Sequence, residues 1–101
     1  MSAADTFAAL GDATRLHVVS RLSREGPLSI TELTERVDVT RQAVTKHLEV
    51  LAAAGLVISE RKGRERVWEL RPRRLEEARQ ALEAISQRWD RALERLRAMV
   101  E

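Results

Sequence analysis

One stretch, residues 40–57, constrains the fold of this chain most, because its side chains separate into two faces at helical spacing. Val44, Leu48 and Leu51 fall on one face, which is apolar. The opposite face carries long hydrogen-bonding side chains near the start of the helix, namely Arg41, Gln42, Thr45 and Lys46. A polar face in this place is typical of a recognition helix, which meets base edges in the major groove of DNA.

A second helix is predicted just before this one. Ser29 and Glu32 match a capping box, in which each side chain bonds to the other residue's backbone N–H. The pattern predicts a short helix over residues 30–37, a turn, and a new helix that Thr40 caps. Residues 29–54 are therefore predicted to form a helix-turn-helix.

A β-hairpin is predicted directly after the helix-turn-helix, over residues 56–70. Residues 56–61 and 66–70 favour strands, and the turn between them contains Gly63. The hairpin also carries the densest basic cluster of the chain, so it resembles the wing of a winged helix-turn-helix.

Two further helices are predicted before residue 27. The first covers residues 3–10, and Asp12 caps the second, which ends at Gly26 and Pro27. We expect the second helix to bury an apolar stripe made of Leu16, Val19 and Leu22, and Val18 flanks this stripe.

The last predicted helix, residues 73–100, has no internal glycine or proline and follows a heptad pattern. Its apolar positions are Leu75, Ala78, Leu82, Ile85, Trp89, Ala92, Leu96 and Met99. So small a domain cannot cover this stripe, so a second copy of the helix is the simplest cover, and packing within one chain is the alternative. The predicted dimer interface comprises Phe7, Leu82, Ile85, Trp89, Leu93 and Leu96. Trp89 either packs in this interface or lines an effector pocket there.

Composition narrows the function further. The chain has no cysteine, which excludes disulfides and thiolate chemistry and fits a reducing cytoplasm. No apolar run approaches the roughly 20 residues that cross a bilayer, and the first residues do not resemble a signal peptide. We therefore expect a cytoplasmic protein without membrane partners. Net charge is +2 overall, but residues 31–74 hold ten Lys and Arg against seven Asp and Glu.

Polar and basic residues on the predicted recognition helix and wing are the candidates for contact with double-stranded DNA. They are Thr40, Arg41, Gln42, Thr45, Lys46, His47, Arg61, Lys62, Arg64 and Arg66. Arg, Lys and Gln suit base edges in the major groove, and Arg64 at the wing tip suits the minor groove or the phosphates. Because strand residues alternate between faces, the four wing cations cannot all face DNA. The alternative is an ordinary solvated polar surface.

Three other polar residues have structural alternatives. His47 is a candidate for contact with the DNA backbone, but a structural role at the edge of the apolar face of its helix fits it equally. Arg15 is expected to make an ion pair or bond a carbonyl, and His17 is expected on the solvated side of its helix. Asp90 and Glu94 are expected to pair with arginines of the same helix.

Three classes of function compete. A dimeric DNA-binding regulator fits the cationic helix and wing, and its two recognition helices would lie about 34 Å apart, which predicts an inverted-repeat operator. A winged-helix module that binds a protein and has no operator is the alternative, although such a surface usually exposes apolar residues. An enzyme is not expected, because the sequence has no nucleophile–base pair, metal cluster or phosphate loop.

Three segments, residues 10–16, 42–48 and 51–57, occur in this order with Arg61 and Gly63 after them. In this combination the chain resembles, over nearly its whole length, the ArsR/SmtB-type winged-helix repressors of prokaryotes. The resemblance implies a homodimer that binds an operator and blocks transcription until a signal, of unknown identity, releases it. Metal sensors of this family use cysteines in the third helix or Asp, His and Glu in the last. This chain has none of those cysteines and no histidine in the last helix, so it resembles a metal-independent branch.

These patterns together predict one mainly α domain over residues 1–101, with a small β-hairpin and a long C-terminal dimerisation helix at 73–100. No metal and no cofactor are expected.

Overall fold

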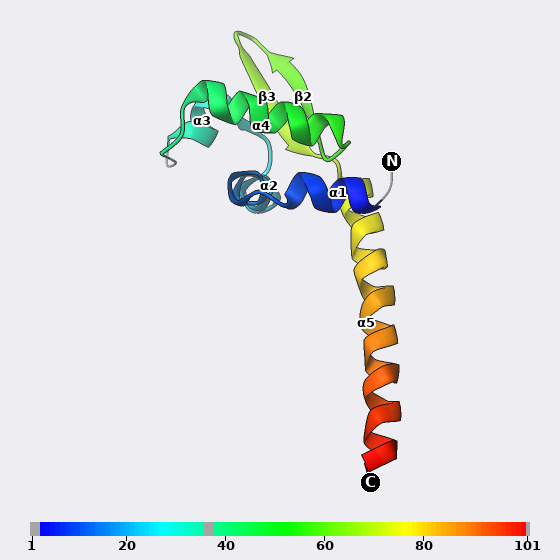
Figure 1. The fold of residues 1–101 in the computed structure, drawn as a ribbon. Coiled ribbons are helices and arrows are strands. Elements are labelled where there is room, and N and C mark those ends of the chain that lie inside the picture. The colour runs from blue at the N-terminus through cyan, green and yellow to red at the C-terminus, as the bar shows by residue number, and fades with distance from the viewer. Residues whose placement is uncertain (1–2, 36–37, 101) are drawn as a thin grey trace.

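Five helices and a small sheet make up the computed structural model, which describes residues 3–35 and 38–100 (Figure 1). The helices are α1 (Ala3–Leu10), α2 (Ala13–Glu25), α3 (Ile30–Thr34), α4 (Arg41–Ala53) and α5 (Pro72–Val100). The strands are β1 (Leu28–Ser29), β2 (Val57–Lys62) and β3 (Glu65–Leu70). They form an antiparallel sheet in the order β1-β3-β2. The predicted fold class, mainly α with a hairpin wing, is confirmed.

The winged domain comprises α1 to β3, and three of its helices, α2, α3 and α4, begin at capping residues where the sequence predicts. Asp12, Ser29 and Thr40 each accept a hydrogen bond from the backbone N–H three residues on, at 2.9, 3.2 and 3.1 Å. The Glu32 carboxylate accepts from the Ser29 N–H at 3.1 Å and completes the capping box. Gly26 ends α2 with a φ of 81°, which glycine adopts without a steric penalty.

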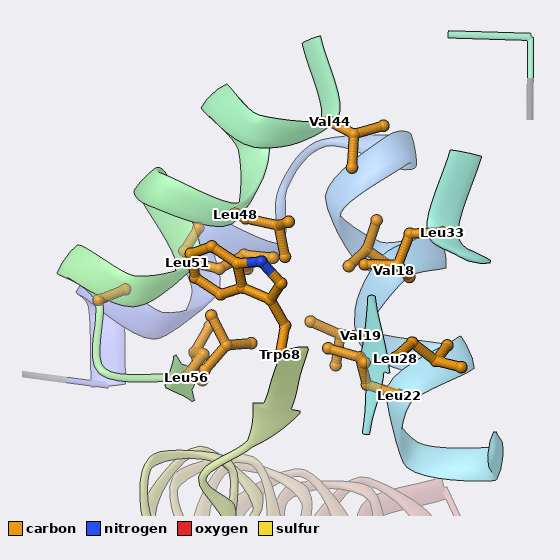
Figure 2. Packing of buried hydrophobic residues seen from close by; sticks show 13 residues of the cluster. Val18, Val19, Leu22, Leu28, Leu33, Val44, Leu48, Leu51, Leu56 and Trp68 are labelled. Carbon is orange, nitrogen blue, oxygen red and sulfur yellow. The ribbon is translucent and has the colours of Figure 1, made fainter. Parts of the chain in front are cut away.

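The core lies between α2, α4 and the sheet. Val44, Leu48 and Leu51 of α4 are fully buried, as their helical spacing predicts. Figure 2 shows the Trp68 indole at the centre of this cluster, between α4 and α2. Among the described residues, Trp68 Nε1 is the one buried side-chain nitrogen or oxygen without a hydrogen-bond partner. Leu28 of β1 pairs with Trp68, so this short strand closes the sheet against the core.

Several local predictions need correction. Leu16 is 51% exposed, and Val18 lies in the core with Val19 and Leu22, so the buried face of α2 is rotated from the predicted one. Helix α3 ends at Thr34 rather than at Val37, and Val37 lies outside the described residues. Strand β1 was not predicted.

The predicted boundaries of the other elements shift by about one residue. In the wing, β2 runs from Val57 to Lys62, and β3 begins at Glu65. Helix α5 begins at Pro72, one residue before its predicted start. Proline is favoured in the first turn of a helix, because its missing N–H has no partner to lose there.

Helix α5 projects far from the rest of the chain (Figure 1). The described chain measures 65 × 26 × 20 Å, and its radius of gyration of 17.7 Å exceeds the roughly 13 Å of a compact 100-residue domain. The 29 residues of α5 span roughly 43 Å, and Ala78 is its one buried residue among those described. The winged domain therefore leaves the outer part of this helix without cover.

Candidate nucleic-acid interface

The first turns of α4 present the predicted DNA-reading side chains. Arg41, Gln42 and Lys46 are exposed, while Val44 and Leu48 on the opposite face are buried. Thr40 is exposed and caps the helix through its hydroxyl. The backbone N–H groups of this helix start carry partial positive charge, which favours a phosphate nearby.

Two side chains on this face are already oriented by hydrogen bonds. Arg41 Nη1 donates to Thr31 Oγ1 at 3.0 Å, which links the start of α4 to α3. The Thr45 hydroxyl donates to the Arg41 carbonyl at 2.8 Å, so its oxygen remains available only as an acceptor. Thr45 is half-buried, and its freedom to reach a base is smaller than that of Lys46 beside it.

The wing is a hairpin whose register decides where its cations point. Lys62 pairs with Glu65 across a two-residue turn of Gly63 and Arg64. Gly63, the first residue of the turn, has a φ of 64°, whereas the φ of Arg64, the second, is not positive, because among the described residues only glycines have a positive φ. A positive φ at the first turn position alone is the pattern of a type II′ turn. The turn places Arg64 at the tip of the wing, as predicted.

Strand pairing separates the remaining wing cations. Arg61 lies opposite Arg66, and both lie on the same face of the hairpin as Trp68. Lys62 lies on the other face. This confirms that the four cations do not share a face. Arg66 Nη1 donates to Ser59 Oγ at 2.7 Å, and Arg61 Nε donates to the Gly63 carbonyl at 3.4 Å.

His47 is separated from the exposed cations. Its side chain is 22% exposed and lies against the start of α2, where Nδ1 approaches Arg15 Nη1 at 3.5 Å. Arg15 Nε donates to the Ala9 carbonyl at 2.6 Å, so the predicted carbonyl contact of Arg15 is confirmed. His17 is exposed, as predicted.

Arg21, which is not among the predicted site residues, joins α2 to α3. Its side chain is buried, and Nη1 donates to the carbonyls of Glu32 and Leu33 at 3.1 and 3.3 Å. Nε pairs with Glu25 at 2.9 Å, and this hydrogen bond raises the pKa of Arg21. The signal available in the sequence was its spacing, since Arg21 falls on the helix face of Val18 with an acid four residues on.

We expect Arg21→Met to lower the free energy of unfolding by about 2–4 kcal/mol, because the carbonyls at the end of α3 lose a charged donor. Arg24→Met is the matched control, since Arg24 is exposed and donates to the Ser20 carbonyl of its own helix at 3.4 Å. Urea denaturation followed by circular dichroism measures both. Equal losses in the two variants would contradict the role of Arg21.

A second candidate surface runs along α5. Its exposed large apolar side chains at heptad positions are Leu82, Ile85, Trp89, Leu96 and Met99, and Leu93 and Val100 are exposed beside them. Phe7 on α1, which packs against α5, is half-buried. Arg79 bridges Glu76 and Glu83 at 2.6 and 2.8 Å beside this stripe, and Glu94 pairs with Arg97 at 3.2 Å, as expected for Glu94.

Residues 3–35 and 38–100 lack two kinds of feature. No group of three or more His, Asp or Glu side chains there could hold a metal ion. No helix there is long and apolar enough to cross a membrane.

Comparisons with known proteins agree with this geometry. Residues 10–60 match the family model described as a helix-turn-helix domain. An uncharacterised HTH-type transcriptional regulator of Bacillus subtilis, YuzN, is 49% identical over 67 residues, which cover 60% of this chain and 73% of that protein. The HTH-type transcriptional regulator Rv2034 of Mycobacterium tuberculosis is 42% identical over 85 residues, 84% of this chain and 76% of its own.

A solved structure extends the likeness to almost the whole chain. An ArsR-like transcriptional regulator from Rhodococcus sp. RHA1 superimposes with a TM-score of 0.79 and 38% identity, covering 98% of this chain and 92% of that one. These relatives are transcriptional regulators and not enzymes, in agreement with the sequence analysis.

Proposed function

This chain belongs to the ArsR/SmtB family of helix-turn-helix transcriptional regulators, and we propose that two copies bind one inverted-repeat operator and repress transcription. One observation supports the DNA contact most directly. The exposed cationic start of α4 and the arginine-bearing wing lie at the end of the molecule opposite to the free end of α5 (Figure 1). One end of the chain is thus suited to phosphates and bases, and the other to a second copy.

Pairing of two copies is proposed from the apolar stripe of α5. Its large side chains are exposed in the single chain, and a contiguous exposed apolar surface of this kind marks an interaction site. The heptad spacing suits a second helix of the same sequence, which would cover both stripes at once. Paired subunits would set two recognition helices about 34 Å apart, or a multiple of that distance.

We also propose that the releasing signal is not a metal ion. The chain has no cysteine, and neither α3 nor α5 contains a histidine. Neither helix therefore offers the thiolate or imidazole ligands that zinc and copper prefer.

A gel shift with random duplex DNA at low and moderate salt separates this function from a protein-binding module. A DNA-binding surface built on phosphate contacts retains random duplex at low salt and releases it as salt rises. A winged-helix module for a protein partner would leave the duplex unshifted at both salt concentrations, and that result would contradict the proposal.

The wing arginine gives a quantitative prediction. We expect Arg64→Ala to lower the slope of log affinity against log salt concentration by about one for each subunit, because one phosphate contact is lost. Fluorescence anisotropy with a labelled duplex at several salt concentrations measures the slope. Arg24→Ala, which removes a cation from α2 instead, should leave the slope unchanged. A wild-type slope in the Arg64 variant would remove this residue from the interface.

A further inference from the structure

One ring nitrogen of the recognition helix lies within reach of two incompatible partners. His47 Nδ1 is 3.5 Å from Arg15 Nη1 and 3.8 Å from Asp12 Oδ2. A guanidinium only donates hydrogen bonds and a carboxylate only accepts them. Nδ1 therefore bonds to Arg15 when it carries no proton and to Asp12 when it carries one. Whether Nδ1 carries a proton, which depends on the tautomer and on the charge of the ring, decides which partner it can bond.

The same two partners hold the junction of α1 and α2. Arg15 Nε and Nη2 donate to the carbonyls of Ala9 and Ala8, at 2.6 and 3.4 Å, at the end of α1. Asp12 accepts from the Arg15 backbone N–H at 2.9 Å and caps α2. Since α1 packs against α5, this junction connects the middle of the recognition helix to the elements of the proposed dimer surface.

We propose that Arg15 is a positioning residue for DNA binding: it holds neutral His47 through Nδ1, and protonation of His47 transfers this nitrogen to Asp12 and weakens operator recognition. In the neutral state the ring proton is on Nε2. In the charged state a proton from solvent occupies Nδ1, that N–H points to Asp12, and the imidazolium repels Arg15. The DNA effect rests on the proposed function, whereas the choice of partner does not.

The charged groups that face the imidazole from the elements packed against it are Asp12, before α2, and Arg15, on α2. The backbone N–H of Arg15 lowers the pKa of Asp12, and the charge of His47 lowers it further. A carboxyl group with a lowered pKa is ionised at neutral pH, so Asp12 remains available as an acceptor for the imidazolium.

Nitrogen NMR of histidine-labelled protein tests the positioning without DNA. We expect His47 above neutral pH to carry its proton on Nε2, with Nδ1 unprotonated. His17, exposed on α2, is the internal control, and these are the two histidines of the chain. In Arg15→Gln, where the amide replaces the guanidinium, we expect the Nε2 preference to weaken. Neutral His47 with its proton on Nδ1 would overturn the proposal.

The DNA effect is tested with an operator selected from a random duplex library. We expect its affinity, relative to random duplex, to fall about fivefold when His47 becomes protonated as pH is lowered stepwise from pH 8, at the lower end of couplings between protein sites. His47→Gln keeps a donor near the position of Nε2 and does not titrate, so its ratio should stay flat. His17→Gln should follow the wild type.

A wild-type pH dependence in His47→Gln would overturn the proposed transfer to Asp12. If no duplex binds at any pH, the proposed function fails, and the DNA effect fails with it. The NMR result still decides the positioning in that case.

Discussion

Replacing Arg41 and Lys46 together by alanine is expected to abolish operator recognition and to leave the dimer intact. Both side chains are exposed on the first turns of α4 and contribute nothing to the core. A good contact between such a side chain and a base edge contributes about 1–3 kcal/mol of discrimination. Losing two such contacts on each of the two recognition helices should cost at least about 4 kcal/mol, which is a loss of roughly 1,000-fold in affinity for the operator.

Anisotropy with the selected operator measures this loss, and sedimentation equilibrium shows whether the dimer persists. Arg24→Ala combined with Arg73→Ala is the matched control, because it removes two exposed cations outside the helix-turn-helix and wing. The Arg41 bond to Thr31 is exposed, so its loss should change stability little. A double variant that still protects its operator would contradict the assignment of α4 as the recognition helix.

Replacing Trp89 by aspartate is expected to weaken pairing and DNA affinity together. The Trp89 side chain is 66% exposed in the single chain and lies near the middle of the α5 stripe. Burial of the exposed part of the Trp89 indole in the dimer interface would stabilise pairing by roughly 2–4 kcal/mol for each subunit. Aspartate would lose this contribution and would also place a charge in an apolar interface. We expect the dimer dissociation constant to rise about 100-fold or more.

Arg91→Asp is the control for Trp89→Asp, because helical spacing places Arg91 on the opposite side of α5 and the new side chain is the same. Sedimentation equilibrium at micromolar concentration measures pairing, and anisotropy measures DNA affinity. A Trp89 variant that binds its operator tightly as a monomer would separate the two properties and contradict the account.

Local signals in the sequence predicted the parts of the fold that depend on neighbouring residues. The caps at Asp12, Ser29 and Thr40 each need only a backbone N–H three residues away. The buried face of α4 follows from spacing, because the polar and apolar sides differ sharply there. The stripe of α5 was predicted for the same reason, and its exposure follows from the size of the winged domain.

The features that sequence reasoning missed depend on contacts between distant segments. Strand β1 has two residues and exists because Leu28 and Ser29 pair with Trp68 and Val67. On α2, Leu16 and Val18 have equal apolar character, and only the packed sheet and α4 decide which is buried.

The candidate site could be predicted in its composition but not in its internal contacts. The register of the wing, which places Arg61 opposite Arg66, required the structure. The approach of His47 to Arg15 spans 32 positions, and no local pattern signals it.

A hydroxyl-radical footprint on the selected operator tests the central claim most directly. Two subunits that each insert one recognition helix should protect two patches related by a two-fold axis, about 10–10.5 base pairs apart centre to centre or at a multiple of that spacing. A single protected patch from one bound chain would contradict the paired arrangement.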